Sequence, residues 1–339
     1  MTKENSILER RRHTSQWVKR LRLALHYGDR PWNTLTIGMA VLTILLMLAI
    51  GILLWLDSGE ARATLGINFL KPTTDASWNP VKGIFQAWPF IYGTLITSLM
   101  SLVLAVPISI GVAVFLAELC PDWLRLPLGW LFELLAAIPS VVYGLWGIFV
   151  FLPAVVTPLG NFLSSTLGDV PGLNLLFHGP IPASGASLFA ASLILSIMIT
   201  PTIAAITRDV FLAIPVTQRE ASLALGATYW ETIWKVLIPY GLSGILGAVI
   251  LGLGRALGET MAVTMVVGNS TGGTLSLMRP GYTMSSIIAN EFAEAVTVLH
   301  SQALIEIGLI LFFITLVLNV LARLLVWRVG HNIPREARA

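Results

Sequence analysis

The sequence is poor in charge and in cysteine, and each shortage excludes a class of protein. Only 12% of its 339 residues are Asp, Glu, Lys or Arg, about half the share of ~25% in an ordinary soluble domain. The one cysteine, Cys120, cannot form an internal disulfide, and it supplies neither a metal cluster nor a redox motif. With 55% hydrophobic residues and a mean hydropathy of +0.80, the composition is that of a membrane protein.

Motifs of nucleotide use and catalysis are also missing. No Gly-x-x-x-x-Gly-Lys-Ser/Thr segment is present, so the chain has no phosphate-cradling loop for ATP. Residues 252–258 are one residue off the dinucleotide pattern and lie in an apolar run. No Ser/His/Asp or Cys/His set is apparent, and His178 has no partners at metal-ligand spacing. We therefore expect no cofactor, no metal and no enzymatic site, and any energy must come from another subunit.

Long apolar runs dominate what is present. A helix that crosses the hydrocarbon of a bilayer needs about 20 mostly apolar residues, and its backbone groups must pair within the helix. The third of the six runs is interrupted at Pro139. The runs cover about residues 34–55, 88–116, 126–156, 187–206, 240–267 and 304–326. This pattern predicts an all-α membrane protein with six transmembrane helices.

The basic residues at the two ends predict the orientation. Residues 1–33 carry eight of them, Lys3, Arg10, Arg11, Arg12, Lys19, Arg20, Arg22 and Arg30, and the tail adds Arg328, Arg335 and Arg338. Because Lys and Arg favour the cytoplasmic side, both termini are expected there, which agrees with an even number of crossings. Such a cluster sets topology or touches anionic lipid, and nucleic-acid binding is not expected. The first run is too long for a signal-peptide core and is expected to be retained.

These boundaries divide the chain into segments. We expect a basic cytoplasmic segment (1–33), a first transmembrane helix (34–56), an external loop (57–87), a core with five transmembrane helices (88–329) and a cytoplasmic tail (330–339). Residues 208–240 form a cytoplasmic loop within the core, and 57–87, 158–186 and 269–301 fall outside. Pro and Gly are dense in the outer segments and indicate turns; these segments are either plain loops or docking sites for an external partner.

The cytoplasmic loop is short, polar and amphipathic. Its apolar residues Leu223, Ala227, Trp230 and Trp234 recur at helical spacing and could share one face, whereas Gly226 can end one short helix and let a second begin. The segment is either a helix lying on the lipid headgroups or a contact for another protein. Periodicity alone leaves both interpretations open.

Arg255 and Glu259 place two opposite charges inside the fifth apolar run. An arginine near the centre of a membrane helix costs about 2.5–3.5 kcal/mol on insertion scales, and a carboxylate four residues on lies on the same helical face. The two can form a structural ion pair, or they can line a polar pathway. A guanidinium matches phosphate oxygens with two parallel hydrogen bonds, and a nearby carboxylate would tune or gate the site by keeping anion binding weak enough for release.

Two prolines interrupt neighbouring runs. If a helix restarts after Pro139, the N–H groups that begin with Ser140 point into the membrane interior and can bind an anion; the alternative is a simple kink. In Thr200-Pro201-Thr202, the hydroxyls either reach the pathway or bond back to their own helix. Gly247, Gly254 and Gly258 are expected to allow close helix packing.

Two groups of residues resemble a known family. Glu220-Ala221-Ser222, with Gly226 four residues after Ser222 and Ile238-Pro239 farther on, is similar to the signature loop of ABC importer permeases. That pattern is Glu-Ala-Ala, three residues, Gly, about nine residues, then Ile-x-Leu-Pro. The chain departs from it at Ser222 and at Leu237-Ile238-Pro239. The resemblance implies that Glu220, Ala221, Ser222 and Gly226 lie on the coupling helix that inserts into an ATPase subunit.

The apolar runs carry a narrower resemblance. Ala137-Ile-Pro139-Ser140-Val-Val-Tyr143-Gly144 and Arg255-Ala-Leu-Gly258-Glu259-Thr260-Met261-Ala-Val are similar to motifs of the phosphate-specific permeases, and the second continues as in the PstC type. This implies a type I ABC importer permease fold in the bacterial inner membrane. The implied pathway residues are Arg255, Glu259, Ser140, Tyr143 and Thr200.

The same resemblance implies the partners. They are a sister permease of the PstA type, two ATP-binding cytoplasmic subunits, an external phosphate-binding protein, phosphate itself and the lipid bilayer. Three alternatives remain open: an ABC permease for another oxyanion such as sulfate or molybdate, an ion-coupled secondary transporter acting alone, and a membrane scaffold without transport. A secondary transporter would be expected to contain internal repeats, and the sequence has no duplicated half.

Overall fold

The computed structural model describes residues 29–72, 78–272 and 275–331. The basic residues before position 28 and those at 335 and 338 therefore lie outside the described residues, and so does the predicted tail beyond residue 331. Within these ranges the secondary structure is helical, apart from two isolated β-bridges, Asn79 with Ile84 and Gly268 with Gly281. The predicted all-α class is confirmed.

The chain divides into two compact units between Leu56 and Asp57. The described part of the first unit is residues 29–56 of helix α2 (Asp29–Asp57), whose apolar side chains are exposed along most of its length. A helix that is apolar on all sides suits lipid. It matches the predicted first transmembrane helix.

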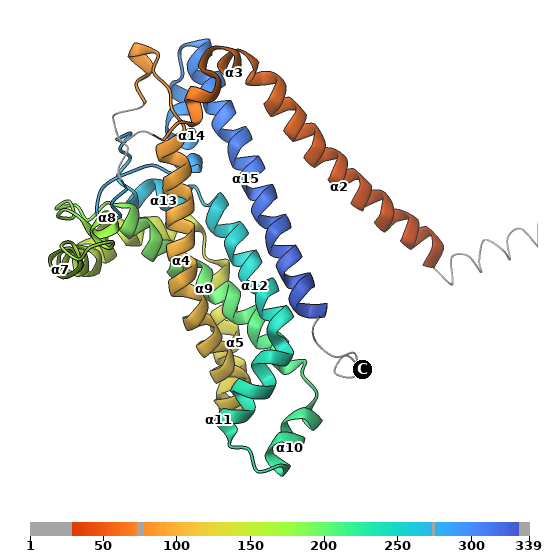
Figure 1. Ribbon diagram of the computed structural model, residues 1–339. Helices are drawn as coiled ribbons and strands as arrows, with labels where there is room; N and C mark the ends of the chain where they lie inside the picture. The colour runs from red at the N-terminus through yellow and green to blue at the C-terminus, as the bar shows by residue number, and fades with distance from the viewer. Residues whose placement is uncertain (1–28, 73–77, 273–274, 332–339) are drawn as a thin grey trace, which may run out of the picture. The chain divides into compact units, whose positions relative to one another are not determined.

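Four long helices form the frame of the second unit (Figure 1). They are α4 (Trp88–Val114), α9 (Leu188–Leu212), α12 (Ile238–Gly258) and α15 (Val298–His331). Helix α9 packs between α4 and α12, and α12 also packs on α15. The core therefore surrounds α9, whose side chains Phe189, Ile194, Met198 and Ile203 are fully buried or nearly so.

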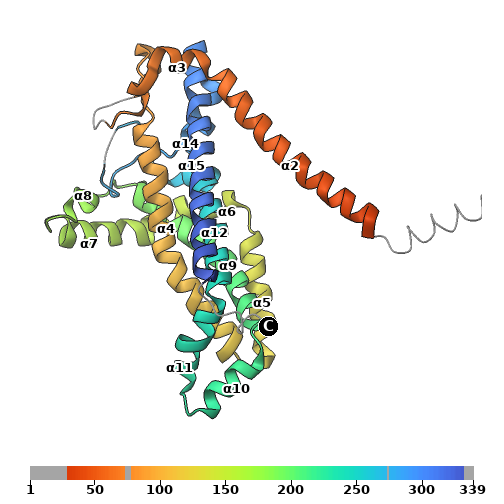
Figure 2. The ribbon, with the colours of Figure 1, turned by 45° about the vertical axis from the view of Figure 1, so that its right-hand side comes forward.

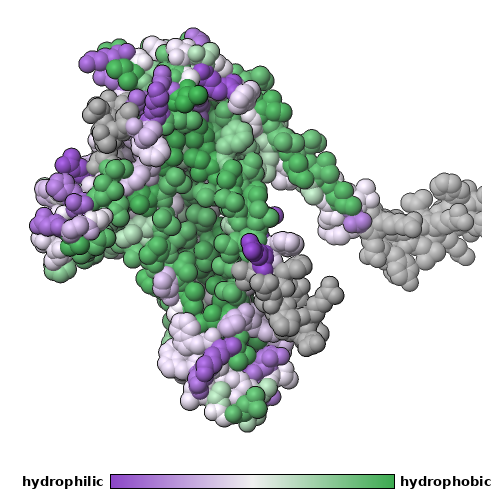
Figure 3. Space-filling model, viewed as in Figure 1, coloured by the Kyte–Doolittle hydropathy of each residue, from purple (hydrophilic) through white to green (hydrophobic). Residues whose placement is uncertain are grey.

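Six helical runs in the described residues are long and apolar enough to cross a membrane, as predicted. Around the second unit, apolar residues form a band along the long helices, and polar residues gather at both ends of these helices (Figure 3). This division is the one expected for helices whose middle parts face hydrocarbon.

The third apolar run breaks where the sequence predicted, but its boundaries differ. Helix α5 (Asp122–Ala137) stops before Pro139, and α6 (Ser140–Trp146) continues through the π-helical η4 (Gly147–Val156) into α7 (Thr157–Leu167). The membrane-length helix is thus Ser140–Leu167 and not a segment within 126–156. Helix α5 is a separate element of 16 residues.

The fifth run also differs from its prediction. Helix α10 (Val216–Ala224) is followed by a continuous helical run of α11 (Tyr229–Thr232), η5 (Ile233–Leu237) and α12. The run starts well before residue 240 and ends at Gly258, and the short helix α13 (Met261–Val266) follows as a separate element. The loop between the fourth and fifth long helices is therefore residues 213–228 and not 208–240, because its second half is already helix.

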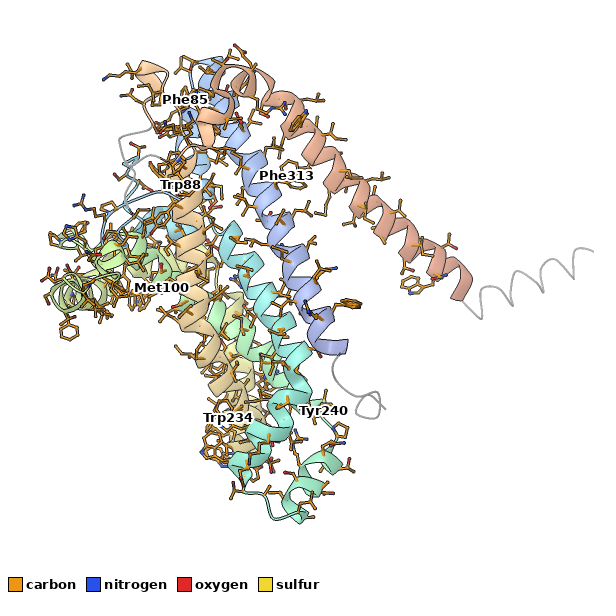
Figure 4. The ribbon with its side chains drawn as sticks, viewed as in Figure 1. Phe85, Trp88, Met100, Trp234, Tyr240 and Phe313 are labelled. Atoms are coloured by element: carbon orange, nitrogen blue, oxygen red, sulfur yellow. The ribbon has the colours of Figure 1, made fainter. Side chains whose placement is uncertain are left out.

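Short elements close the end of the second unit opposite α10 and α11 (Figures 1 and 2). They are α3 (Gly59–Leu65), η1 (Gly66–Leu70), η2 (Pro80–Lys82), α14 (Met284–Glu291) and η6 (Phe292–Glu294), and α8 (Asn174–Phe177) lies on the 158–186 segment. The carboxylate of Glu291 accepts hydrogen bonds from Trp78 Nε1 at 2.6 Å and pairs with His300 Nε2 at 3.0 Å. Phe85, which is labelled in Figure 4, stacks on His300. These contacts make this end an ordered cap.

Candidate functional site

The guanidinium of Arg255 lies where three helices meet. Its Nη1 donates to the hydroxyl of Thr202 on α9 at 3.2 Å and to the carbonyl oxygen of Ala136 on α5 at 3.3 Å. Arg255 itself belongs to the last turn of α12. One cation therefore joins α5, α9 and α12 near the point where α5 and α12 both stop.

The end of α5 presents carbonyl oxygens that have no partner within the helix. Two of them are satisfied by side chains: Ala136 by Arg255, and Leu135 by the hydroxyl of Tyr143 at 2.9 Å. A cation beside the negative end of a helix dipole stabilises it by about 0.3–1 kcal/mol. Arg255 thus has a structural role at the break before Pro139, and Tyr143 shares it.

This structural role uses only part of the guanidinium. Within the described residues, Nη1 is the only nitrogen of Arg255 that forms hydrogen bonds. Nε and Nη2 form none, and neither atom is fully buried. These two nitrogens form the edge of the fork that binds an oxyanion with two parallel hydrogen bonds. The half-buried Arg255 therefore keeps one bidentate edge accessible.

Glu259 does not pair with Arg255, and the prediction that it lies one turn farther along the same helix is wrong. Helix α12 ends at Gly258, and Glu259 has extended backbone angles. Its Oε1 accepts a hydrogen bond from the backbone N–H of Ala262 at 3.2 Å, and its carbonyl accepts one from the hydroxyl of Ser285 at 2.7 Å. The carboxylate thus caps α13, while its Oε2 has no hydrogen bond among the described residues.

The segments that restart after the two breaks lie side by side. A methyl group at Gly144 of α6 would come 3.3 Å from the Cα atom of Ala262, and one at Gly147 would come 3.0 Å from Val266. The order of these contacts shows that α6 and α13 run parallel. Ser140 is therefore the first residue of a helix that starts beside the end of α5, and its N–H has no partner within that helix.

The two threonines around Pro201 have different partners. The hydroxyl of Thr200 donates to the carbonyl oxygen of Ser196 at 2.7 Å, which is back-bonding within α9. The hydroxyl of Thr202 accepts from Arg255. Of the two, Thr202 therefore belongs to the Arg255 site by direct contact, and a role for Thr200 in the pathway stays a prediction.

The glycines of α12 divide into two sets. Added methyl groups at Gly244 and Gly252 would collide with Val210 and Ile203 of α9, so these glycines allow the close packing of the two helices. At Gly247, Gly254 and Gly258, a methyl group would meet no atom within 4 Å in the described part of the chain. Within the described residues, this second set does not pack α12 against another helix, because its side of α12 is open, and close helix packing at these glycines stays a prediction.

The loop residues are built around Gly226. Its φ of +86° is in the left-handed region, where a glycine carries no steric penalty. The N–H of Gly226 donates to Leu223 and that of Ala227 donates to Ser222, which is the Schellman pattern that ends a helix. Glu220, Ala221 and Ser222 lie on α10, and the predicted break at Gly226 is confirmed.

Helix α10 offers one face to solvent. It contains no buried residue, and Glu220, Ala221 and Leu223 are exposed on it. Leu223 does not share a helical face with Trp230 and Trp234, because the turn at Gly226 separates α10 from α11. Trp234 lies at the α10–α11 end of the second unit, as labelled in Figure 4.

Sequence reasoning missed the pair formed by Arg219 and Glu118. Arg219 of α10 binds Glu118, which lies near the end of the long α4 run. The sequence offered the Thr202 hydroxyl as a pathway group or a bond back to its own helix, and the structure shows it bound to Arg255. The pairing of Arg219 with Glu118 joins positions 101 residues apart, and a single sequence carries no signal for it. Within the described part of the chain, no group of three His, Cys, Asp or Glu side chains is placed to bind a metal ion.

Known proteins resemble this chain over most of its length. Residues 105–331 match the family described as the binding-protein-dependent transport system inner membrane component. The phosphate transport system permease protein PstC of Pasteurella multocida is 46% identical over 93% of this chain and 97% of its own length. The PstC of Mesorhizobium japonicum is 46% identical over 89% and 90%.

A more distant relative and a solved structure extend the comparison. PstC 2 of Mycobacterium tuberculosis is 39% identical over 87% of this chain and 91% of its own length. A chain of the MetNI methionine ABC transporter in an inward-facing conformation is 19% identical, with a TM-score of 0.49, over 72% of this chain and 94% of its own.

Proposed function

Because this chain belongs to the family of binding-protein-dependent transport system inner membrane components, we propose that it is the permease subunit of an ATP-driven importer for inorganic phosphate. Relatives that match about nine-tenths of the chain or more are phosphate transport system permeases, which supports phosphate as the substrate. The family membership favours this function over a secondary transporter acting alone. The chain is a multi-pass membrane protein, and we place it in the bacterial inner membrane with both termini in the cytoplasm.

The accessible edge of Arg255 carries the proposal. Its Nε and Nη2 donors are not used by the described residues, while Nη1 is anchored to α5 and α9. An anchored guanidinium with a free fork binds a tetrahedral oxyanion without first having to be ordered. Arg255 thus contacts phosphate as it passes.

The groups around Arg255 complete the proposed pathway. Helix α6 begins at Ser140 beside the end of α5, and the N–H groups at a helix start favour anions. Tyr143 fixes the end of α5 and so positions this start. Glu259 uses one carboxylate oxygen to cap α13 and keeps the other free, so it can limit the dwell time of an anion near Arg255. We also propose a pathway role for Thr200, whose hydroxyl bonds to the Ser196 carbonyl within α9.

We propose a partner for each of the open surfaces. The proposed contact for one of two ATP-binding subunits is α10 and its end, with Glu220 and Ala221 exposed on the helix, Ser222 half-buried beside them and Gly226 at the turn that follows. A sister permease of the PstA type covers the open glycine side of α12, and an external phosphate-binding protein delivers phosphate at the α3–α14 end. ATP binding and hydrolysis then take place in the partner subunits.

Replacing Arg255 by glutamine tests the site. Loss of one charge-assisted hydrogen bond of about 1.5–3 kcal/mol predicts that phosphate uptake falls about tenfold or more, while the ATPase subunits still co-purify. Arg255→Lys should be intermediate because it keeps the charge and loses the fork. Arg328→Gln, which removes an exposed arginine near the end of α15, is the matched control.

The uptake is measured with radiolabelled phosphate in the presence of excess unlabelled sulfate, molybdate or phosphate. Competition by phosphate alone supports the proposed substrate, and competition by sulfate or molybdate points to another oxyanion. Normal phosphate uptake by Arg255→Gln would remove Arg255 from the pathway.

A further inference from the structure

Helix α10 is attached to the rest of the chain at few points. It has no buried residue, and within the described residues only two of its side chains, Arg219 and Ser222, form hydrogen bonds to other elements. The hydroxyl of Ser222 pairs with that of Thr232 on α11 at 2.9 Å. The apolar cluster beneath α10, with Val114, Phe211, Ile233 and Leu237 among its members, includes no residue of α10. Apart from the chain that joins α10 to α9 and α11, Arg219 is therefore the side chain through which α10 holds both the α4 run and the end of α9.

Arg219 is held from two directions. Its Nε lies 3.0 and 3.1 Å from the two carboxylate oxygens of Glu118, and its Nη2 lies 2.7 Å from Oε1. Nη1 and Nη2 also donate to the carbonyl oxygens of Ile214 and Phe211, each at 2.7 Å. The guanidinium thus binds the end of the α4 run and the end of α9 at the same time. Its fixed fork geometry cannot be reproduced by lysine.

Glu118, the ion-pair partner of Arg219, lies on the membrane-spanning α4 run. Its side chain is only 4% exposed, and it lies in η3 (Phe115–Leu119), the π-helical end of the α4 run. The hydroxyl of Tyr229, at the start of α11, donates to the Glu118 carbonyl at 3.3 Å. Both sides of the loop therefore hold the same turn of helix. A buried, multiply hydrogen-bonded pair of this kind keeps its geometry when one side moves, because separating the charges is costly.

We infer that Arg219 and Glu118 form a mechanical joint, in which Arg219 is the positioning residue that carries a displacement of α10 to α4 and α9. The inference rests on the proposed function of α10 as the contact for an ATPase subunit. Helix α4 runs from this joint to Trp88 at the opposite end of the second unit (Figure 4). A shift of the joint is thereby transmitted to the end that would receive the external binding protein.

The test uses the full complex in proteoliposomes with its binding protein. The main variant is Glu118→Gln with Arg219→Met, which removes the joint without leaving a buried charge unpaired. The second variant is Arg219→Lys, which keeps the positive charge and loses the forked geometry of the guanidinium. The matched control is Lys235→Met, which breaks the exposed ion pair with Glu231 (3.0 Å) in the same region.

The double variant should retain the co-purifying ATPase subunits and their ATP hydrolysis, whereas phosphate moved per ATP should fall about tenfold, as for the loss of a typical coupling free energy. For Arg219→Lys, the phosphate moved per ATP should be intermediate between the values of the double variant and the wild type. Lys235→Met should give the wild-type value. Unchanged transport per ATP in the double variant would overturn the inference. So would loss of the ATPase subunits in proportion to transport, because the pair would then only shape the docking surface.

A second readout does not depend on phosphate. Spin labels at Val81→Cys and Val296→Cys occupy positions that are 97% and 94% exposed, just before α4 and α15, and the native Cys120 is buried. In the wild-type background, ATP should change the distance between the labels, and the double variant should abolish this change. A change that persists in the double variant refutes the joint. Absence of phosphate transport in the wild type, with the ATP-driven change intact, would instead refute the proposed substrate.

Discussion

Alanine at Gly252 should destabilise the protein, whereas alanine at Gly254 should not. The two glycines lie two residues apart in α12 and differ in what they face. A methyl group at Gly252 would come 2.6 Å from Cδ1 and 2.8 Å from Cγ1 of Ile203, while one at Gly254 would meet no described atom within 4 Å. Because the substitution and the helix are the same, the comparison isolates the contact between α12 and α9.

The expected magnitude follows from these distances. Ordinary van der Waals contact of a methyl carbon begins at 3.4 Å, so α12 and α9 must separate or Ile203 must leave its rotamer. Ile203 is fully buried, and overpacking of such a site costs about 1–3 kcal/mol. Both variants gain up to about 1 kcal/mol from the better helix propensity of alanine. The difference between Gly252→Ala and Gly254→Ala should therefore be about 1–3 kcal/mol.

The assay is unfolding of the purified chain by SDS in mixed micelles, followed by tryptophan fluorescence. Ile203→Val removes Cδ1, the atom nearest the added methyl group, so it should relieve part of the cost of Gly252→Ala. Contacting residues typically show coupling energies of about 0.5–3 kcal/mol in such a cycle. Equal stability of the two alanine variants, or no coupling between positions 252 and 203, would refute the described packing of α12 on α9.

Two further predictions concern α10. Gly226→Ala should cost about 1–2 kcal/mol because φ is left-handed there, and Gly226→Asn should cost less; weaker co-purification of the ATPase with alanine than with asparagine is the readout, and equal recovery would contradict it. Ser222→Ala removes the hydrogen bond to Thr232, so the stability of the protein, followed by thermal inactivation of transport, should fall by no more than the ~1 kcal/mol of one hydrogen bond. A larger loss of stability would show that Ser222 has another partner.

The helix breaks differ in how visible they are in the sequence. Pro139 predicted its break correctly because proline removes a backbone donor, and Gly226 did so because it fits a helix end followed by a polar stretch. The break after Gly258 was not predicted. A glycine within an apolar run is equally compatible with a continuous helix, and α12 stops there with Glu259 bonded to Ala262 and Ser285. Those contacts come from the fold and not from the local sequence.

The candidate site was predictable in its central residue and not in its connections. Arg255 was recognisable in the sequence because a cation inside an apolar run is costly and is kept only with a compensating partner or a function. Its partners did not stand out, because the Ala136 carbonyl carries no side-chain signal and Thr202 lies 53 residues away. Arg219 was overlooked for a related reason: a charge in a polar loop is usually solvated, and only the fold shows Glu118 beside it.

Helix α9 connects the proposed substrate site to the proposed joint. Its Thr202 hydroxyl accepts a hydrogen bond from Arg255, and its Phe211 carbonyl accepts one from Arg219. Nine residues of helix separate these contacts by about 14 Å along the axis. Of the six membrane-length helices in the described residues, α9 is the most enclosed, with 67% of its apolar window buried, so we expect it to move as a rigid element. A displacement of α10 can therefore alter the surroundings of Arg255 without any direct contact between α10 and α12.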